Sequence, residues 1–258
     1  MIVHVSTFWR YKWLLYELVL RDLKIKYRSS VLGYLWSLLN PLMMMTVLTI
    51  VFSTLFRFDI PNYPVYLLSG QLIYSFFSEA TNMSMSSIIN SASLIKKVYI
   101  PKYIFPVSRV LSSFVTLLLS LLAMVIVMVV TQVKFNWVIL FFPIPLIYIL
   151  VFSIGMGLLL SVLAVYFRDV IHLYSVLLSA WMYLTPIMYP INMVPDYVKR
   201  FIFWNPMYYF VEIFRQIVLY GEWPSLEMHL ICLGFALLAL VTGLFVFYKN
   251  QKNFILHV

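Results

Sequence analysis

Residues 21–41 read RDLKIKYRSSVLGYLWSLLNP and change, without a break, from a basic stretch into an uncharged apolar one. The basic half is costly to place in hydrocarbon, whereas the apolar half and the residues after it are long enough to cross it. The stretch therefore predicts the point at which the chain passes from a membrane surface into the membrane.

Composition supports a membrane protein. Of the 258 residues 64% are hydrophobic and only 10% are charged, and the mean hydropathy is +0.96. Soluble domains carry about 25% charged residues, so lipid is the expected solvent. The net charge of +9 does not indicate nucleic acid, because Lys and Arg lie in short gaps between apolar runs. The single cysteine, Cys232, excludes an intrachain disulfide.

Residues 8–30 are predicted to form an amphipathic helix in the plane of the lipid headgroups. At about 100° per residue, a charged stripe adjoins an aromatic and aliphatic one. The charged stripe comprises Arg10, Glu17, Arg21, Lys24 and Arg28, and the apolar stripe Trp9, Trp13, Tyr16, Leu20, Leu23 and Tyr27. The alternative is an ordinary amphipathic helix packed on its own protein.

The remaining chain reads as one all-α membrane domain, residues 1–258. Its predicted spans are 31–56, 65–90, 110–130, 138–167, 171–189 and 228–248. The second span is unusual because it contains Gln71, Glu79, Asn82 and several serines. Lipid-facing helices do not tolerate such residues, so this helix is expected to line a partner helix or a wet cavity.

Residues 191–225 contain two short apolar pieces, separated at Asn205 and Pro206 and closed by Gly221. Neither piece is long enough to span a membrane, which favours a re-entrant helical hairpin. The alternative is a single poor transmembrane helix, which would reverse the side of the C-terminus. With six spans, 13 of the 18 Lys and Arg residues lie on the side of the two termini. The positive-inside rule then places both termini in the cytoplasm and the hairpin outside.

The sequence offers no catalytic constellation and no metal-ligand spacing. It contains no GxxxxGK[ST] phosphate loop. A lone Glu79 and the absence of a repeat do not fit an ion-driven transporter. If the chain moves a substrate, the energy is expected to come from a partner.

Aromatic rings beside hydroxyls and amides suit a passing sugar chain, through stacking and exchangeable hydrogen bonds. The candidate substrate path comprises Tyr66, Tyr74, Phe77, Glu79, Trp181, Tyr183 and Tyr189. The alternative for any single aromatic residue is the interfacial belt of a membrane protein.

The stretch at 21–41 closely resembles the N-terminal signature of ABC-2 type permeases, in the branch that exports polysaccharides such as O-antigen, capsule and teichoic acid. Further similar motifs are SLIKKVYIPK at 93–102, YFRD at 166–169 and WNPMYYFVEIFRQ at 204–216. The resemblance covers essentially the whole chain in order.

The resemblance implies a homodimer of six-span subunits, paired with two separate ABC ATPase subunits that hold ATP and Mg²⁺. It also implies a lipid-linked polysaccharide as substrate and the plasma (inner) membrane as location, with no cofactor on this chain. The implied ATPase-coupling residues are Arg21, Lys24, Lys26, Arg28, Leu94, Ile95, Lys96, Lys97 and Tyr99. The alternative for Lys96 and Lys97 is topology alone.

The two short helices before the last span would close the outer end of the channel. The implied outer-gate residues are Trp204, Asn205, Tyr208, Tyr209, Glu212 and Arg215. We expect Glu212 to pair with Arg215, and Arg168 with Asp169. Two other functions stay open: a membrane-embedded enzyme of envelope synthesis, and an ABC-2 permease for a small drug or lipid.

Overall fold

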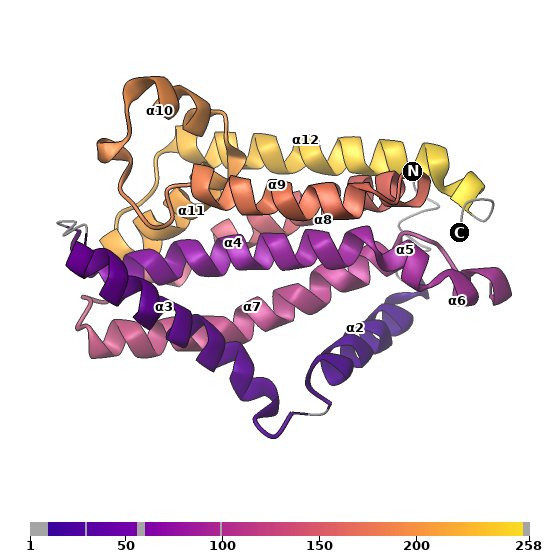
Figure 1. The fold of residues 1–258 in the computed structure, drawn as a ribbon, viewed down its shortest axis with the longest axis horizontal. Helices are drawn as coiled ribbons and strands as arrows, with labels where there is room; N and C mark the ends of the chain where they lie inside the picture. Colours follow the sequence, from indigo (N-terminus) through magenta and orange to yellow (C-terminus); the bar gives the residue numbers. More distant parts are fainter. Residues whose placement is uncertain (1–9, 29, 56–59, 99, 255–258) are drawn as a thin grey trace.

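The computed structural model describes residues 10–28, 30–55, 60–98 and 100–254, and within these ranges the chain is helical and has no strand. The prediction of an all-α protein is confirmed. Long helices run along the long axis of the molecule (Figure 1). Helices α2 and α6 lie at one end, together with the end of α12, and α10 and α11 lie at the other.

The chain forms α2 (Lys12–Tyr27), η1 (Gly33–Leu35), α3 (Trp36–Leu55), α4 (Tyr63–Met85), α5 (Ser87–Asn90), α6 (Ala92–Lys97), α7 (Ile104–Val130), η2 (Trp137–Phe141) and α8 (Pro143–Tyr166). It continues with α9 (Val170–Leu184), η3 (Ile191–Met193), α10 (Asp196–Phe203), α11 (Pro206–Arg215), η4 (Gln216–Tyr220), α12 (Leu226–Asn250) and η5 (Gln251–Asn253).

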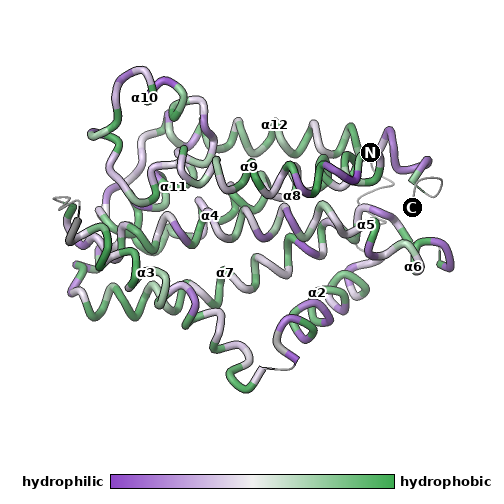
Figure 2. Tube along the Cα trace, viewed as in Figure 1, coloured by the Kyte–Doolittle hydropathy of each residue, from purple (hydrophilic) through white to green (hydrophobic). Residues whose placement is uncertain are grey.

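Four helical stretches in the described ranges are long and apolar enough to cross a membrane: Gly33–Ser53, Ile104–Val130, Trp137–Tyr166 and Leu226–Asn253. Figure 2 shows these stretches as mainly apolar, with hydrophilic residues gathered in α2 and α6. Helix α9 is apolar but shorter, at 15 residues. Helix α4 has the length of a span, but its hydroxyls, amides and carboxylate make it more polar than these four stretches.

Helix α4 is the centre of the bundle. It packs against α3, α7, α8, α9 and α11, and most of its side chains are buried, including the hydroxyls of Ser69, Thr81 and Ser84. These hydroxyls find acceptors within the protein. Thr81 donates to the carbonyl of Phe77 (2.7 Å), and Ser84 donates to that of Pro106 (3.1 Å). These buried hydroxyls of α4 are thus satisfied within the protein.

Helices α8 and α12 pack in parallel at very close range. Gly155 of α8 lies so near the backbone of Ala239 and Leu240 in α12 that an added Cβ would overlap it. Gly243, one turn further along α12, lies equally close to Gly155. Small residues at both positions allow the two backbones to meet.

A second hydrophobic cluster lies at the end of the bundle that holds α2 and α6. Leu18 of α2, Phe105 of α7, Leu158 of α8 and Phe247 of α12 are all buried there. Leu94 and Ile95 of α6 are half-buried against the same cluster. This cluster joins the N-terminal helix and the loop helices to the bundle.

Two details differ from the sequence-based expectation. Helix α9 ends at Leu184, before the predicted end of the fifth span, because Pro186 disfavours helical geometry at Thr185. Arg168 and Asp169 form no ion pair within 4.0 Å, although both belong to the described chain. Both are exposed in a turn, where pairing of two charges gains little free energy.

We expect Gly155→Ala to destabilise the bundle by about 1–3 kcal/mol, because the new methyl group forces α8 and α12 apart. Thermal unfolding in detergent measures the change. Gly234→Ala is the control: this glycine lies in the partner helix α12, where an added Cβ meets nothing within 4 Å. Equal stability of the two variants would contradict the packing described here.

Candidate functional site: a polar groove beside α4

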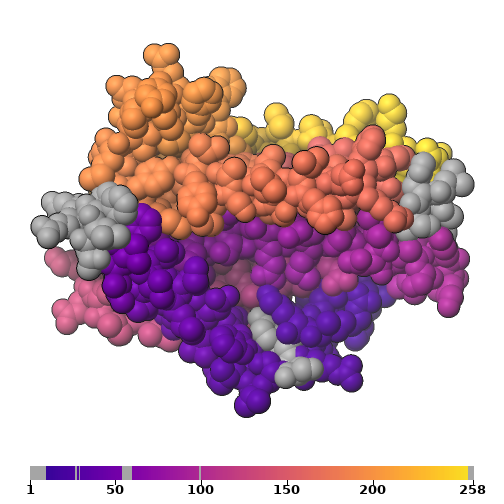
Figure 3. Space-filling view, viewed as in Figure 1, coloured from indigo at the N-terminus to yellow at the C-terminus, as the bar shows by residue number. Residues whose placement is uncertain are grey.

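A groove of about 800 Å³ lies between α3, α4 and α7 and the end of α9. Figure 3 shows the surface over α2, α3 and α4, which is hollowed between α2 and α4. Its polar lining includes Ser37, Asn40, Gln71, Ser75, Glu79, Ser113, Thr116 and Ser120, and its aromatic lining Trp36, Tyr74, Phe76 and Tyr183. Methionine and leucine side chains line much of the remainder. The groove therefore offers hydrogen bonds, ring faces and an apolar surface to one ligand.

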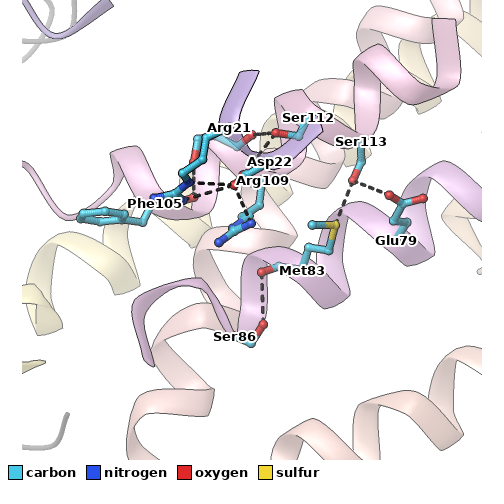
Figure 4. A network of polar contacts seen from close by, with 10 residues as sticks. Arg21, Asp22, Glu79, Met83, Ser86, Phe105, Arg109, Ser112 and Ser113 are labelled. Carbon is cyan, nitrogen blue, oxygen red and sulfur yellow. Dashed lines mark hydrogen bonds and ion pairs between the residues drawn. The ribbon is translucent and has the colours of Figure 1, made fainter. Parts of the chain in front are cut away.

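An ion pair between α2 and α4 lines one end of this groove. Lys26 Nζ lies 2.6 Å from Glu79 Oε1, and the Ser113 hydroxyl donates a long hydrogen bond (3.5 Å) to the same oxygen. Figure 4 shows Glu79 beside Ser113 and Met83. The side chains of Lys26 and Glu79 are 36% and 34% exposed. An ion pair this exposed contributes little stability, about 0–1 kcal/mol.

A second ion pair fixes α2 to α7 one helical turn earlier. Asp22 Oδ1 lies 2.8 Å from Arg109 Nη1 and 3.2 Å from Arg21 Nη2, and Ser112 donates to Asp22 Oδ2 at 3.4 Å. The Asp22 side chain is 0% exposed and that of Arg109 is 18% exposed. Loss of one partner from such a buried pair leaves an uncompensated charge. Asp22 and Arg109 were not among the predicted site residues.

Helix α2 has one face packed on the protein and another face exposed. Leu18 and Leu23 are buried along with Asp22, so one face of the helix packs on its own protein. Trp13 and Tyr16 remain exposed. Helix α2 is therefore anchored on one side and keeps an aromatic surface open on another.

The predicted coupling residues lie on two separate helices, α2 and α6. Arg21, Lys24 and Arg28 line an open groove of about 610 Å³ together with Glu17 and Tyr34. Lys96 and Lys97 are exposed at the end of α6. Tyr99 lies outside the described residues.

The predicted path residues lie in three different surroundings. Tyr74, Glu79 and Tyr183 line the groove. Phe77 is fully buried between the rings of Phe152 and Trp181, with centroids 5.4 and 5.3 Å away.

Tyr66 and Tyr189 meet in the segment that follows α9. The hydroxyl of Tyr66 donates to the carbonyl of Tyr189 at 3.0 Å, and that of Tyr189 donates to the carbonyl of Tyr183 at 2.7 Å. These two residues therefore hold the chain between α9 and η3.

The predicted gate residues lie around α10 and α11. Trp204 is exposed, whereas Asn205 is buried and accepts hydrogen bonds from Trp181 Nε1 (2.7 Å) and the Met207 amide (2.9 Å). Tyr208 and Tyr209 are half-buried, and their rings stack edge to face.

The predicted pairing of Glu212 with Arg215 is wrong, since no ion pair within 4.0 Å joins these two described residues. The Arg215 guanidinium points into the protein, where backbone carbonyls take its hydrogen bonds.

We expect Asp22→Ala to cost about 3–5 kcal/mol, because Arg109 would remain largely buried without its carboxylate. Thermal denaturation of the purified chain measures the loss. Asp196→Ala is the control, since Asp196 pairs with Lys199 on the exposed surface of α10, where no measurable change is expected. An Asp22 variant as stable as the control would contradict the anchoring of α2.

The comparisons with known proteins agree with this helical architecture. The family model for the ABC-2 type transporter matches residues 14–219. The chain is 30% identical to the O-antigen export system permease protein RfbA of Myxococcus xanthus, over 98% of both chains. It is 31% identical to RfbA of Klebsiella pneumoniae, over 91% of this chain and 90% of the relative.

A more distant relative is the polysialic acid transport protein KpsM of Escherichia coli, at 25% identity over 79% of this chain and 80% of the relative. Both the family model and the RfbA relatives cover most of the sequence. The helices long enough to span a membrane lie within the same alignment. The chain is thus a multi-pass membrane protein that belongs to the ABC-2 type transporter family.

Proposed function

We propose that this chain is the permease subunit of an ATP-driven exporter, and that it moves a lipid-linked polysaccharide of the O-antigen type across the plasma membrane. Relatives named as O-antigen and polysialic acid transport proteins support this substrate class. Teichoic acid, capsule and small lipids or drugs are the alternative substrates. A membrane-embedded envelope-synthesis enzyme is the alternative from another class.

The groove beside α4 is the observation that carries the proposal. Its hydroxyls, amides and rings suit sugar units, whereas Met44, Leu48 and Leu117 offer an apolar surface for a lipid chain. A lipid-linked glycan needs both kinds of surface. A small apolar drug would not need the row of hydroxyls.

ATP hydrolysis belongs to a separate ABC ATPase, two copies of which would serve a homodimer of this chain and hold ATP and Mg²⁺. Helices α2 and α6 are the proposed docking elements, because both carry exposed cations. The exposed apolar faces of α3 and α9, for example Ile50 and Val176, are available to lipid or to the second copy. The Lys26–Glu79 pair connects the docking helix with the groove.

In the membrane, α3, α4, α7, α8, α9 and α12 would be the six spans. Helix α2 would lie in the cytoplasmic interface, and α10 with α11 would form the outer re-entrant hairpin. The excess of Lys and Arg at the α2 and α6 end supports this orientation.

Orientation can be tested with cysteines in a Cys232→Ala background. We expect Lys134→Cys to react with an impermeant thiol reagent added outside intact cells, and Lys252→Cys to react only after permeabilisation. Both side chains are exposed, so neither is protected by packing. The reverse labelling pattern would refute the proposed topology.

Exchange of the Lys26–Glu79 charges tests the link between docking helix and groove. Lys26→Glu and Glu79→Lys should each reduce export of surface glycan at least about tenfold, because each places like charges together. The double variant should restore most of the export. Exchange of Lys199 and Asp196 on α10 is the matched control and should have no effect. Failure of the double variant to recover would remove the pair from the coupling mechanism.

The function itself is tested by deletion. We expect loss of this chain to remove surface polysaccharide while lipid-linked polymer accumulates inside the cell, and expect the purified chain to stimulate ATP hydrolysis by its partner ATPase. Intact surface glycan would refute the proposal. Transfer of sugar or phosphate by the isolated chain would favour the enzyme alternative.

A further inference from the structure

The chain leaves helical geometry immediately after α9. Residues 185–190, here called the strap, run from the end of α9 at Leu184 to η3 at Ile191 without a helical turn. Thr185 is extended because a residue before proline avoids the helical region. A non-helical backbone in a membrane protein persists only where protein groups or a water-filled cavity satisfy its polar atoms. The strap therefore needs partners.

Two tyrosines from the first turn of α4 supply some of them. Tyr63 donates its hydroxyl to the carbonyl of Met188 at 2.8 Å. Tyr66 donates to the carbonyl of Tyr189 at 3.0 Å and approaches that of Pro186 at 3.3 Å. Both rings are buried. The strap is thus tied along its length to the central helix.

Arg215 of α11 completes this set. Its side chain is 1% exposed, its Nη1 donates to the carbonyl of Pro186 (2.8 Å), and its Nη2 donates to those of Ile187 (3.0 Å) and Tyr66 (3.2 Å). The guanidinium carbon lies 3.6 Å from the centre of the Tyr66 ring. Gly70 leaves room for it, since a Cβ there would come within 2.8 Å of Nη2. One cation thereby holds α4, α11 and the strap together.

The strap is also a thin partition between two spaces. Ile187 and Met188 line the groove beside α4. Pro186 and Pro190 line a separate cavity of about 280 Å³, whose other walls include Tyr208, Glu212, Arg215 and Tyr220. Neighbouring residues of one extended segment therefore face the groove and the cavity.

We propose that the strap is the barrier that closes the groove toward the outer side, and that Arg215 is the positioning residue that keeps it closed. The proposal rests on the function and orientation proposed above. It differs from the sequence-based expectation, in which the two short helices α10 and α11 themselves form the closure. Here α11 serves as the anchor, and the moving part is the short segment that Arg215 holds.

The shape of the guanidinium explains why arginine is required. Its planar fork donates to several carbonyls at once, whereas an ammonium is a compact point charge that cannot span them. Arg215→Lys keeps the positive charge and removes the fork. It should therefore free the strap while leaving the charge of α11 unchanged.

The experiment uses Ile187→Cys in the full chain with its partner ATPase. Ile187 is 2% exposed, so the new thiol should resist an impermeant reagent added from the outer side at rest. We expect Arg215→Lys to raise its labelling rate about tenfold or more, as loss of hydrogen bonds to a charged group predicts. We also expect ATP turnover to raise labelling in the chain that retains Arg215.

Two controls separate a local opening from general loosening. Native Cys232 in α12 is 0% exposed, and its peptide should stay unlabelled in every variant. Arg200→Lys on the exposed face of α10 should leave labelling of Ile187→Cys unchanged.

The proposal is overturned if the thiol of Ile187→Cys stays unlabelled in the Arg215→Lys variant, or if it is labelled only together with Cys232. It is also overturned if ATP turnover that exports glycan leaves this thiol unlabelled. In that last case the proposed function stands and only the barrier is refuted. Absence of export by the chain that retains Arg215 and Ile187 would instead count against the proposed function.

Discussion

Helix α4 carries a carboxylate, amides and many hydroxyls through a bundle whose other long helices are apolar enough to face lipid. Hydrocarbon offers these groups no hydrogen bonds, so each must find a partner within the protein or face a wet cavity. The rest of the arrangement follows from this requirement. Helices α3, α7, α8, α9 and α11 surround α4, and the groove opens along the side where its polar residues remain accessible.

The contacts that hold the elements at the two ends of the groove are of different kinds. At the α2 end, the half-exposed Lys26–Glu79 pair is cheap to break, whereas the buried Asp22–Arg109 pair one turn earlier is costly to break. Helix α2 can therefore move at Lys26 while it stays attached at Asp22. At the other end, Tyr63, Tyr66 and Arg215 hold a strap with no helical hydrogen bonds of its own. At each end of the groove, a part proposed to move, α2 near Lys26 or the strap, thus lies beside a part that stays fixed.

Much of this could be predicted from the sequence, because its signals are local. Apolar runs predict the long helices, and Gln71 and Glu79 in one of them predict a helix that does not face lipid. The missing features depend on partners distant in the sequence. No residue close to Asp22 in the sequence indicates its pairing with Arg109. Glu212, three residues before Arg215, is the obvious local partner for the guanidinium, whereas the partners in the structure are backbone carbonyls distant in the sequence. Thr185 and Pro186 are a local signal for the early end of α9. The long apolar run around them nevertheless favoured a longer predicted span.

In the proposed mechanism α4, the helices α7 and α8 that pack on it, and α12 that packs on α8 form a fixed frame, against which only α2 and the strap move. Experimental structures of the assembled transporter without nucleotide and with ATP bound would test it most directly. We expect these four helices to superimpose in the two states, while the Lys26–Glu79 distance increases and residues 185–190 shift. A change in the packing of α8 on α12 at Gly155, with the strap unmoved, would contradict it.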